Sequence, residues 1–270
     1  MNIRFVDSLH LPELEAYRTL KRPLEHQLAG FFVAEGEKVV RRLLESHLRV
    51  RSLLLTQEWL DAYQPLLKSR TEAMEIYVSE KRVMEEIVGF RLHKGVMAIA
   101  DIPKAITMEE ASAASMHPHL FVAVDGIMNS ENLGVIARNC ASFGVNALLV
   151  GENSCDPYLR RAVRNSMGSI FTLPIVRLSS IAAELAQIRD SFGLRLIGAH
   201  PRNSSSALEK VDFKRDCCVV FGAEGEGISG KVLALCDELA TIPMLRGVDS
   251  INVGSASAVV LYEVQCQRRH

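Results

Sequence analysis

Three segments in the second half of the chain contain the residues whose types and spacing could do chemistry. They are residues 125–138 (DGIMNSENLGVIAR), 221–229 (FGAEGEGIS) and 242–263 (IPMLRGVDSINVGSASAVVLYE). Each lies at the end of a run of apolar residues that indicates a strand. Ligands of open α/β sheets collect at the carboxyl ends of the strands. The three segments are therefore the first candidates for a ligand site.

The segment 125–138 is ambiguous when it is taken alone. Asn132 can cap the start of a helix, because an asparagine side chain accepts hydrogen bonds from free backbone N–H groups. Arg138 then lies two turns into the same helix. For this segment alone, an ordinary cap followed by a surface arginine explains the pattern better than a catalytic pair does.

The glycine-rich segment 221–229 predicts a tight turn directly after an apolar strand. Its glycines let the backbone approach a ligand closely or adopt positive φ. The spacing is not that of the G-x-G-x-x-G dinucleotide fingerprint, and Gly-Lys-Ser/Thr of a phosphate-binding Walker loop is missing. A carboxylate buried in such a turn, such as Glu224, needs a polar partner. A turn chosen only for its geometry is the plain alternative.

The third segment passes through a polar loop into a helix rich in glycine, alanine and serine. Small side chains permit close approach of a neighbouring backbone, so we expect this helix to pack against another chain or a tightly threaded segment. A core helix fits the same pattern, and the two interpretations do not exclude each other.

Composition is compatible with nucleic-acid binding but does not indicate it. The 270 residues are 48% hydrophobic, enough for two domains, and the formal net charge of −1 gives no overall attraction for nucleic acid. Short basic clusters occur at residues 41–42, 49–51, 91–94 and 160–164. Each cluster alone is more often a solvated face than a binding patch, and as a set they are compatible with RNA.

The chain also has features of a protein of the reducing cytoplasm. Its six cysteines include no C-x-x-C pair, which favours reduced, mostly buried thiols. Arg4 and Asp7 interrupt the first ten residues, where a secretory signal would need an unbroken apolar stretch, and no apolar run is long enough to span a membrane. We therefore expect a cytoplasmic location.

Alternating strands and helices must position the three segments. From residue 119 onward, apolar strands are indicated at 120–124, 147–150, 171–176, 194–198, 217–221 and 239–243. Helices are indicated at 132–143, 158–166, 179–191, 230–236 and 252–267. This order predicts an α/β domain with a parallel sheet covered on both faces.

A smaller α/β module precedes this domain. Its pattern predicts a helical lead-in over the first twenty or so residues, strands at 31–33, 50–55, 73–78 and 95–100, and helices at 36–46 and 80–88. The predicted division is an N-terminal domain over residues 1–104, a linker over 105–118 and a second domain over 119–270.

The three segments, in this order, resemble the SpoU/TrmH family of the SPOUT superfamily of RNA methyltransferases. The resemblance covers roughly one domain at the end of the chain. It implies that the C-terminal helix is threaded through a loop to form a deep trefoil knot, a topology that general connection rules count as nearly absent. It also implies S-adenosylmethionine as cofactor, a ribose 2′-hydroxyl of RNA as the methyl acceptor, no metal, and a homodimer formed through this domain.

The resemblance implies roles for individual residues, carried over by motif. The active-site residues would be Arg138, Asn132, Glu224, Ser250 and Asn252. Backbone groups that hold the adenosine of the cofactor would come from Gly222, Ile242, Met244 and Ile251. Residues of a loop that contacts RNA would be Arg164, Ser166 and Gly168.

Within the active site, each of these side chains has an expected task. Asn132 and Arg138 would face the ribose and phosphate of the RNA, and Glu224 would brace the arginine or the glycine turn. Ser250 and Asn252 would shape the site. A guanidinium stays protonated in proteins, so Arg138 is expected to act as an electrostatic clamp on phosphate and the developing alkoxide rather than as a base.

Two positions depart from the pattern of the family. Asn129-Ser130 replaces an Asp-Pro pair that many members have, which alters the rigidity of the loop because proline fixes φ. Gly254 replaces a serine, which removes a hydroxyl that could have bonded within the active site. The second change would shift more of the mechanism onto Arg138 and Ser250.

The N-terminal module is similar to the ribosomal-protein-like RNA-binding domain of many ribosomal-RNA members of the family. Residues 95–100 (GVMAIA), preceded by residues 90–94 (FRLHK), carry this weaker match. It favours ribosomal RNA over transfer RNA as the partner. The alternatives are a transfer-RNA 2′-O-methyltransferase and an inactive RNA-binding or assembly factor; a nucleotide-dependent oxidoreductase ranks last because its glycine fingerprint is missing.

Overall fold

The computed structural model describes residues 2–8, 11–88, 95–201, 205–245, 247 and 249–269. The basic cluster at 91–94 and the stretch 90–94 therefore lie outside the described residues. By their contacts the residues divide into two compact units. One is Met1–Lys104 with Pro157–Phe171, and the other is Ala105–Asp156 with Thr172–His270.

The first unit is built on a five-stranded sheet with the order β1-β4-β3-β5-β2. β5 is antiparallel to both of its neighbours, and the remaining pairs are parallel. The strands are β1 (Asn2–Phe5), β2 (Phe31–Glu35), β3 (Val50–Leu55), β4 (Glu75–Val78) and β5 (Val96–Asp101). The helices are η1 (Pro12–Leu14), α1 (Glu15–Arg18), α2 (Pro23–Leu28), α3 (Glu37–Glu45), α4 (Gln57–Ser69), α5 (Lys81–Val88), α8 (Arg160–Asn165) and η2 (Ser169–Phe171).

Two elements of this unit differ from the sequence prediction. The predicted helical lead-in begins instead with the edge strand β1, where Ile3 is paired with Ile76 of β4. All four residues of β1 are exposed, and the strand is only four residues long, so the sequence gives a weak signal for it. Residues 57–69, for which the pattern assigns no element, form α4 with Pro65 inside it.

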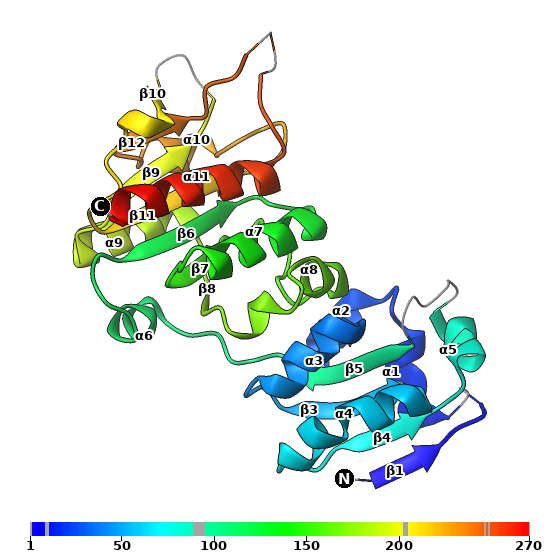
Figure 1. Cartoon of the computed structure of the whole chain (residues 1–270). Coiled ribbons are helices and arrows are strands. Elements are labelled where there is room, and N and C mark those ends of the chain that lie inside the picture. Colours follow the sequence, from blue (N-terminus) through cyan, green and yellow to red (C-terminus); the bar gives the residue numbers. More distant parts are fainter. Residues whose placement is uncertain are drawn as a thin grey trace. The chain divides into compact units, whose positions relative to one another are not determined.

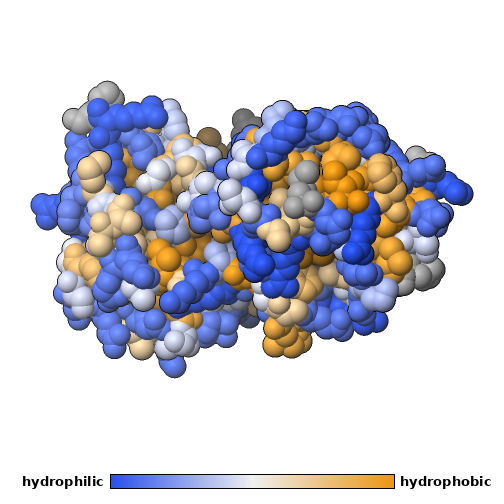
Figure 2. Space-filling view, turned by 90° about the horizontal axis from the view of Figure 1, so that it is seen from below, coloured by the Kyte–Doolittle hydropathy of each residue, from blue (hydrophilic) through white to orange (hydrophobic). Residues whose placement is uncertain are grey.

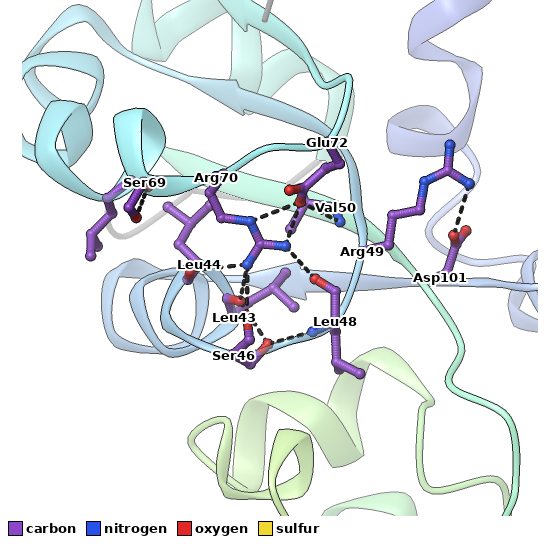
Figure 3. Close-up of polar contacts among 11 residues, drawn as sticks. Leu43, Leu44, Ser46, Leu48, Arg49, Val50, Ser69, Arg70, Glu72 and Asp101 are labelled. Atoms are coloured by element: carbon purple, nitrogen blue, oxygen red, sulfur yellow. Dashed lines mark hydrogen bonds and ion pairs between the residues drawn. The ribbon is translucent and has the colours of Figure 1, made fainter.

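One arginine satisfies the last carbonyl groups around the end of α3 (Figure 3). The guanidinium of Arg70 donates to the backbone oxygens of Leu44 at 3.0 Å, Ser46 at 2.8 Å and Leu48 at 2.5 Å. It also forms an ion pair with Glu72, whose carboxylate accepts a hydrogen bond from the backbone N–H of Val50. Because helix ends leave carbonyls without intrahelical partners, this cluster fixes the turn between α3 and β3.

The second unit contains a seven-stranded sheet with the order β10-β12-β9-β11-β6-β7-β8, and every pair in it is parallel. The predicted α/β domain with a parallel sheet is thereby confirmed. The strands are β6 (Leu120–Asp125), β7 (Ala147–Val150), β8 (Ile175–Arg177), β9 (Arg195–Ala199), β10 (Ser206–Ala207), β11 (Cys217–Gly222) and β12 (Glu238–Thr241). The helices are α6 (Met108–Ala113), α7 (Ser130–Ser142), α9 (Ile181–Phe192), η3 (Leu208–Lys210), α10 (Gly230–Leu233) and α11 (Val253–Arg268).

Helices cover both faces of this sheet (Figure 1). Alternate strand residues such as Phe121 and Val220 pack in one apolar core with Leu185 of α9 and Val232 of α10. α7 and α11 lie side by side over the opposite face. The strands are nearly continuous apolar runs because both faces are buried.

The boundaries between the units differ from the predicted ones in two places. Residues 105–118, predicted as a linker, include α6, whose Met108 and Ala111 are buried in the core of the second unit. A capping box starts this helix, because Thr107 and Glu110 exchange side-chain to backbone hydrogen bonds. Residues 157–171 belong by their contacts to the first unit, although they lie in sequence between β7 and β8.

On the face shown in Figure 2, hydrophobic residues reach the surface in patches among hydrophilic ones. The large apolar side chains that are most exposed include Phe5, Leu24, Leu28, Met116, Met128, Leu245 and Tyr262. Among the residues that the structure describes, no helix combines the length and apolar character that a membrane crossing needs.

Candidate active site

The carboxyl ends of four strands meet at one edge of the second sheet. Gly222 at the end of β11 is paired with Asp125 at the end of β6, and Ala240 of β12 is paired with Ala199 of β9. A cavity of about 360 Å³ opens at this edge, lined by residues that follow β9, β11 and β12 and by the start of α11. Its volume is in the range of small-molecule sites.

Most of the predicted site residues lie at this cavity. All four residues predicted to hold the cofactor line it: Gly222, Ile242, Met244 and Ile251. Three of the predicted active-site residues also line it: Glu224, Ser250 and Asn252. Asn132 and Arg138 lie on α7, outside this lining.

The glycine turn after β11 is closed on itself by backbone hydrogen bonds. Ala223 N–H donates to Gly227 O at 3.0 Å, and Gly227 N–H donates to Ala223 O at 2.9 Å. A Cβ placed on Gly222 would lie 2.1 Å from the carbonyl carbon of Gly227, so no other residue fits there. The turn is a cradle of backbone against which a ligand can lie closely.

A buried carboxylate anchors the far end of this turn. Asp125 is only 5% exposed, and its Oδ2 accepts a hydrogen bond from the backbone N–H of Ser229 at 2.8 Å. Asp125 has no predicted role, although its position as the last residue of β6 was a signal for one. It ties the first and second segments together.

The three segments are joined by a chain of side-chain hydrogen bonds. Nδ2 of Asn132 donates to the carboxylate of Glu224, and Nδ2 of Asn252 donates to Oδ1 of Asn132 at 3.0 Å. Oδ1 of Asn252 accepts from the N–H of Gly254 at 2.9 Å and so caps α11. One residue from each segment thereby has a fixed orientation at the cavity.

This arrangement corrects two expectations for the first and second segments. Asn129, not Asn132, caps α7, and its Oδ1 accepts from the N–H of Glu131 at 2.9 Å and from that of Asn132 at 3.4 Å. Asn132 is therefore inside the helix and its side chain is available for the site. Glu224 was expected to be buried and to brace either Arg138 or the glycine turn, but it is exposed and its side chain accepts a hydrogen bond from Asn132.

Arg138 lies on the exposed side of α7. Its side chain has no hydrogen bond or ion pair with the described residues, so its guanidinium has five donors available to an incoming anion. Ser250 is also exposed, at the rim of the cavity. Both positions are accessible to a large substrate.

The packing of α11 against α7 explains the departure at Gly254. A Cβ at this position would lie 2.9 Å from Cγ1 of Val135 on α7. Nδ2 of Asn139 donates to the carbonyl of Gly254 and to Oγ of Ser257, both at 2.9 Å. A side chain at this position would have to displace Val135, so glycine suits the helix crossing, and small residues in α11 permit the close approach that the sequence predicts.

The three residues predicted to contact RNA belong to the first unit. Ser166 is fully buried, and its hydroxyl donates to Val163 O and accepts from Gly168 N–H. The side chain of Ser166 therefore shapes the turn and does not reach the surface, contrary to the prediction of direct contact. Arg164 is half exposed and pairs with the buried Glu35 at 3.3 Å, beside Arg160, which also pairs with Glu35. Of the three residues, Arg164 is the one whose side chain can reach an RNA.

Two further residues at the cavity were missed by the sequence analysis. His200 directly follows β9 and lines the cavity, with its ring next to Gly227, where a Cβ would lie 3.0 Å from the ring carbon Cε1. Asp249 lines the cavity next to Ser250. With Glu224 and Glu226, Asp249 gives the cavity a negative rim that suits a cationic ligand.

A separate cluster lies at the amino ends of β6 and β11. It consists of His117, His119 and Asp216, each of which offers one potential metal-ligand atom, and these three atoms lie within 4.8 Å of one another. Nδ1 of His117 bonds Asp216 at 2.6 Å, and Arg268 donates to the carbonyl of His119 at 2.9 Å. Burial lowers the pKa of His119, as do the nearby His117 and Arg268. The adjacent guanidinium opposes a cation here, and we interpret the cluster as an anchor for the end of α11.

The chain is similar to known proteins over most of its length. The model of the SpoU rRNA Methylase family matches residues 119–262. An uncharacterized tRNA/rRNA methyltransferase of Mycobacterium tuberculosis is 33% identical over 261 residues, which cover 93% of this chain and 88% of that protein. A protein of the same description from Synechocystis is 27% identical over 270 residues, covering 99% of this chain and 95% of that one.

Solved structures share the fold of the whole chain. The SpoU methyltransferase AviRb from Streptomyces viridochromogenes has a TM-score of 0.81 at 25% identity, covering 96% of this chain and 98% of that one. AviRb has also been crystallised with its cofactor AdoMet. An AdoMet-bound rRNA methyltransferase from Sinorhizobium meliloti has a TM-score of 0.83 at 22% identity, with 98% of both chains covered.

Proposed function

Because the chain belongs to the SpoU rRNA methylase family, we propose that it uses S-adenosylmethionine to methylate a ribose 2′-hydroxyl in RNA, and specifically in ribosomal RNA. The coarser statement, an S-adenosylmethionine-dependent methyltransferase acting on RNA, follows from membership of the family. The 2′-hydroxyl and the ribosomal substrate are our proposal.

The observation that carries the proposal is the hydrogen-bonded chain Glu224–Asn132–Asn252 at the edge of the cavity. It draws one side chain from each of the three segments to a single place. A site that served only to bind an RNA scaffold would not need three separated segments to converge beside a small-molecule cavity.

The residues present fit S-adenosylmethionine. The backbone cradle at Gly222, which a Cβ would fill, allows a flat group to lie against the turn. Ile242, Met244 and Ile251 offer apolar contact together with backbone donors and acceptors, and the carboxylates of Glu224, Glu226 and Asp249 suit a cationic ligand. When bound, the sulfonium group supplies a methyl electrophile, so no metal is needed for activation.

The protein's own residues then have to position the sugar and assist loss of its proton. Asn132 and Asn252 present amide groups whose orientation is fixed, which suits the holding of a ribose. A guanidinium is a cation and a poor base, so the task of Arg138 is to clamp the neighbouring phosphate and stabilise the developing alkoxide. The proton then passes to the phosphate or to water. Ser250, at the rim, completes the contact with the nucleotide.

The proposal also includes the RNA-binding role of the first unit, the knot, the homodimer and the cellular location. The first unit would bind the ribosomal RNA as a ribosomal-protein-like domain, with Arg164 as one contact. α11 would be threaded through a loop as a trefoil knot, consistent with its tight packing on α7. A homodimer would form through α7 and α11, and the exposed Val259 and Tyr262 of α11 supply apolar surface for it. The location would be cytoplasmic.

Cofactor binding and substrate choice test the proposal together. Calorimetry with S-adenosylmethionine should give one site per chain, and labelled methyl should appear in unmodified ribosomal RNA transcripts. Label in transfer RNA alone would instead identify transfer RNA as the substrate. Absence of cofactor binding would favour an RNA-binding or assembly factor that has lost turnover.

A further inference from the structure

The first unit contains a second cavity, larger than the one beside the glycine turn. It has a volume of about 1010 Å³ and opens at the carboxyl ends of β1, β3 and β4. We propose that this cavity receives an unpaired nucleobase of the RNA substrate, preferentially one that carries an exocyclic amino group. The inference rests on the proposed function in taking RNA as the substrate, and it assigns a recognition site that methyl transfer itself does not require.

The walls of the cavity suit a flat aromatic ligand. Trp59 and Phe5 line it, and Phe5 is 75% exposed although it is a large aromatic residue. The buried apolar side chains of Val6, Val78 and Val83 also line the cavity. Unpaired bases bind proteins by stacking on aromatic side chains in this way.

The floor of the cavity holds a polar group that awaits a partner. Ser79 directly follows β4, lines the cavity and is only 6% exposed. Its Oγ has no hydrogen-bond partner in the described part of the chain. A buried hydroxyl without a partner is unfavourable, and a ligand in the cavity that Ser79 lines can supply one. The edge of a nucleobase provides both donors and acceptors for it.

The charges around the cavity determine which part of a nucleotide enters. Asp7, Glu58 and Glu80 line it together with Lys81 and Arg82. The carboxylates repel phosphate but accept hydrogen bonds from amino groups, as acidic residues do from the amino group of cytosine. The two basic residues can contact the flanking phosphates. A base therefore enters while the backbone stays at the rim, and bases with an amino group are preferred over uracil.

Trp59 provides a direct readout, because it is the only tryptophan of the chain. The full chain, saturated with S-adenosylhomocysteine to fill the cofactor site, is titrated with short single-stranded oligoadenylate, oligocytidylate and oligouridylate, and with paired RNA. Stacking should quench the fluorescence of Trp59 with oligoadenylate and oligocytidylate, more weakly with oligouridylate, and not with the duplex.

Two variants and one control make the test specific. Ser79→Ala and Glu80→Gln should each weaken the binding of oligoadenylate by about three- to ten-fold, the effect of one lost hydrogen bond. Glu45→Gln removes an exposed carboxylate of α3 that does not line the cavity, and it should leave the affinity unchanged. Thermal unfolding of each variant checks that the first unit is intact.

The outcomes separate this inference from the proposed function. Quenching that both Ser79→Ala and Glu80→Gln weaken supports the base site, even if no RNA accepts a methyl group and the proposed function fails. Absence of quenching by every oligonucleotide overturns the base site, even if methyl transfer is observed. Quenching that neither variant changes overturns it as well.

Discussion

Asn252 donates a hydrogen bond to Asn132 at 3.0 Å, and the two residues are 120 positions apart in sequence. The side-chain amide of Asn132 in turn donates a hydrogen bond to the carboxylate of Glu224. The bond joins the start of α11 to the first turn of α7 beside the cavity. The orientation of both amide groups is thereby set before any substrate arrives, which is the property that a positioning site requires.

Replacing Asn132 by alanine should lower turnover while leaving the fold intact. The change removes a hydrogen bond to a charged carboxylate and one to Asn252, so we expect single-turnover methyl transfer to fall by about 10- to 100-fold. The dissociation constant for S-adenosylmethionine should change little. Asn129→Ala, the matched control, removes the true cap of α7 and should instead lower the free energy of unfolding by about 1 kcal/mol. Equal turnover in Asn132→Ala and the wild type would contradict the assigned role.

Substitutions of Arg138 show whether the site needs only a positive charge or also the arrangement of N–H donors of a guanidinium. The side chain is exposed and unpartnered in the described chain, so Arg138→Ala should change stability by no more than about 0.5 kcal/mol. Its methyl transfer should fall by about 10²- to 10³-fold, as for the loss of one stabilising donor. Arg138→Lys keeps the positive charge and should retain measurable activity. Complete loss in the lysine variant, measured in single turnovers, would show that the guanidinium geometry is indispensable.

Replacing Gly222 by alanine should abolish the cradle for the cofactor. The new Cβ would lie 2.1 Å from backbone atoms of the turn, which must move. We expect a loss of about 1–3 kcal/mol in unfolding free energy from the overpacking and at least a tenfold weaker cofactor affinity, measured by calorimetry. Gly230→Ala is the control, because a Cβ there meets nothing within 4 Å. Cofactor binding by Gly222→Ala as tight as that of the control would count against the site.

The stability of the chain in acid should depend on Glu72. Burial raises the pKa of its carboxyl, but hydrogen bonds from Arg70 and from the backbone outweigh this and hold the pKa below the usual 4.5. The folded pKa is thus lower than the unfolded one, so the carboxylate stabilises the fold above about pH 4.5 and this contribution is lost as the pH falls through the folded value.

Urea unfolding across this range tests the contribution of Glu72. Glu72→Gln should be less stable than the wild type at neutral pH by about 1–3 kcal/mol, and the difference should shrink in acid. A difference that does not depend on pH would mean that the contribution is packing alone. Glu45→Gln, an exposed change on α3, should show little difference at any pH.

The parallel sheet could be predicted from the sequence because its strands are buried on both faces. β6 and β11 are continuous apolar runs that end at Asp125 and Gly222, so both the strands and the place of the site were recognisable. β1 was missed because its four residues are exposed and its pairing depends on β4, more than seventy positions later.

The details of the site depend on contacts that local patterns do not contain. The choice between Asn129 and Asn132 as the cap depends on where α7 starts, and the two assignments give Asn132 opposite roles. The glycine at 254 appeared to be a lost hydroxyl until the crossing of α11 over α7 placed it against Val135. Residues 157–171 belong to the first unit through contacts with residues far earlier in the chain, such as the hydrogen bond from Arg160 to Glu35, 125 positions away.

Transfer of the methyl group to a ribose hydroxyl can be checked from the chemical position of a transferred label. The chain is incubated with labelled S-adenosylmethionine and unmodified ribosomal RNA, and the product is digested with alkali and with nuclease. We expect label in an alkali-resistant dinucleotide at one position and in the sugar of its nucleoside, with none for Arg138→Ala. Label recovered in a free base, or equal labelling by Arg138→Ala, would rule out methylation of the ribose by this site.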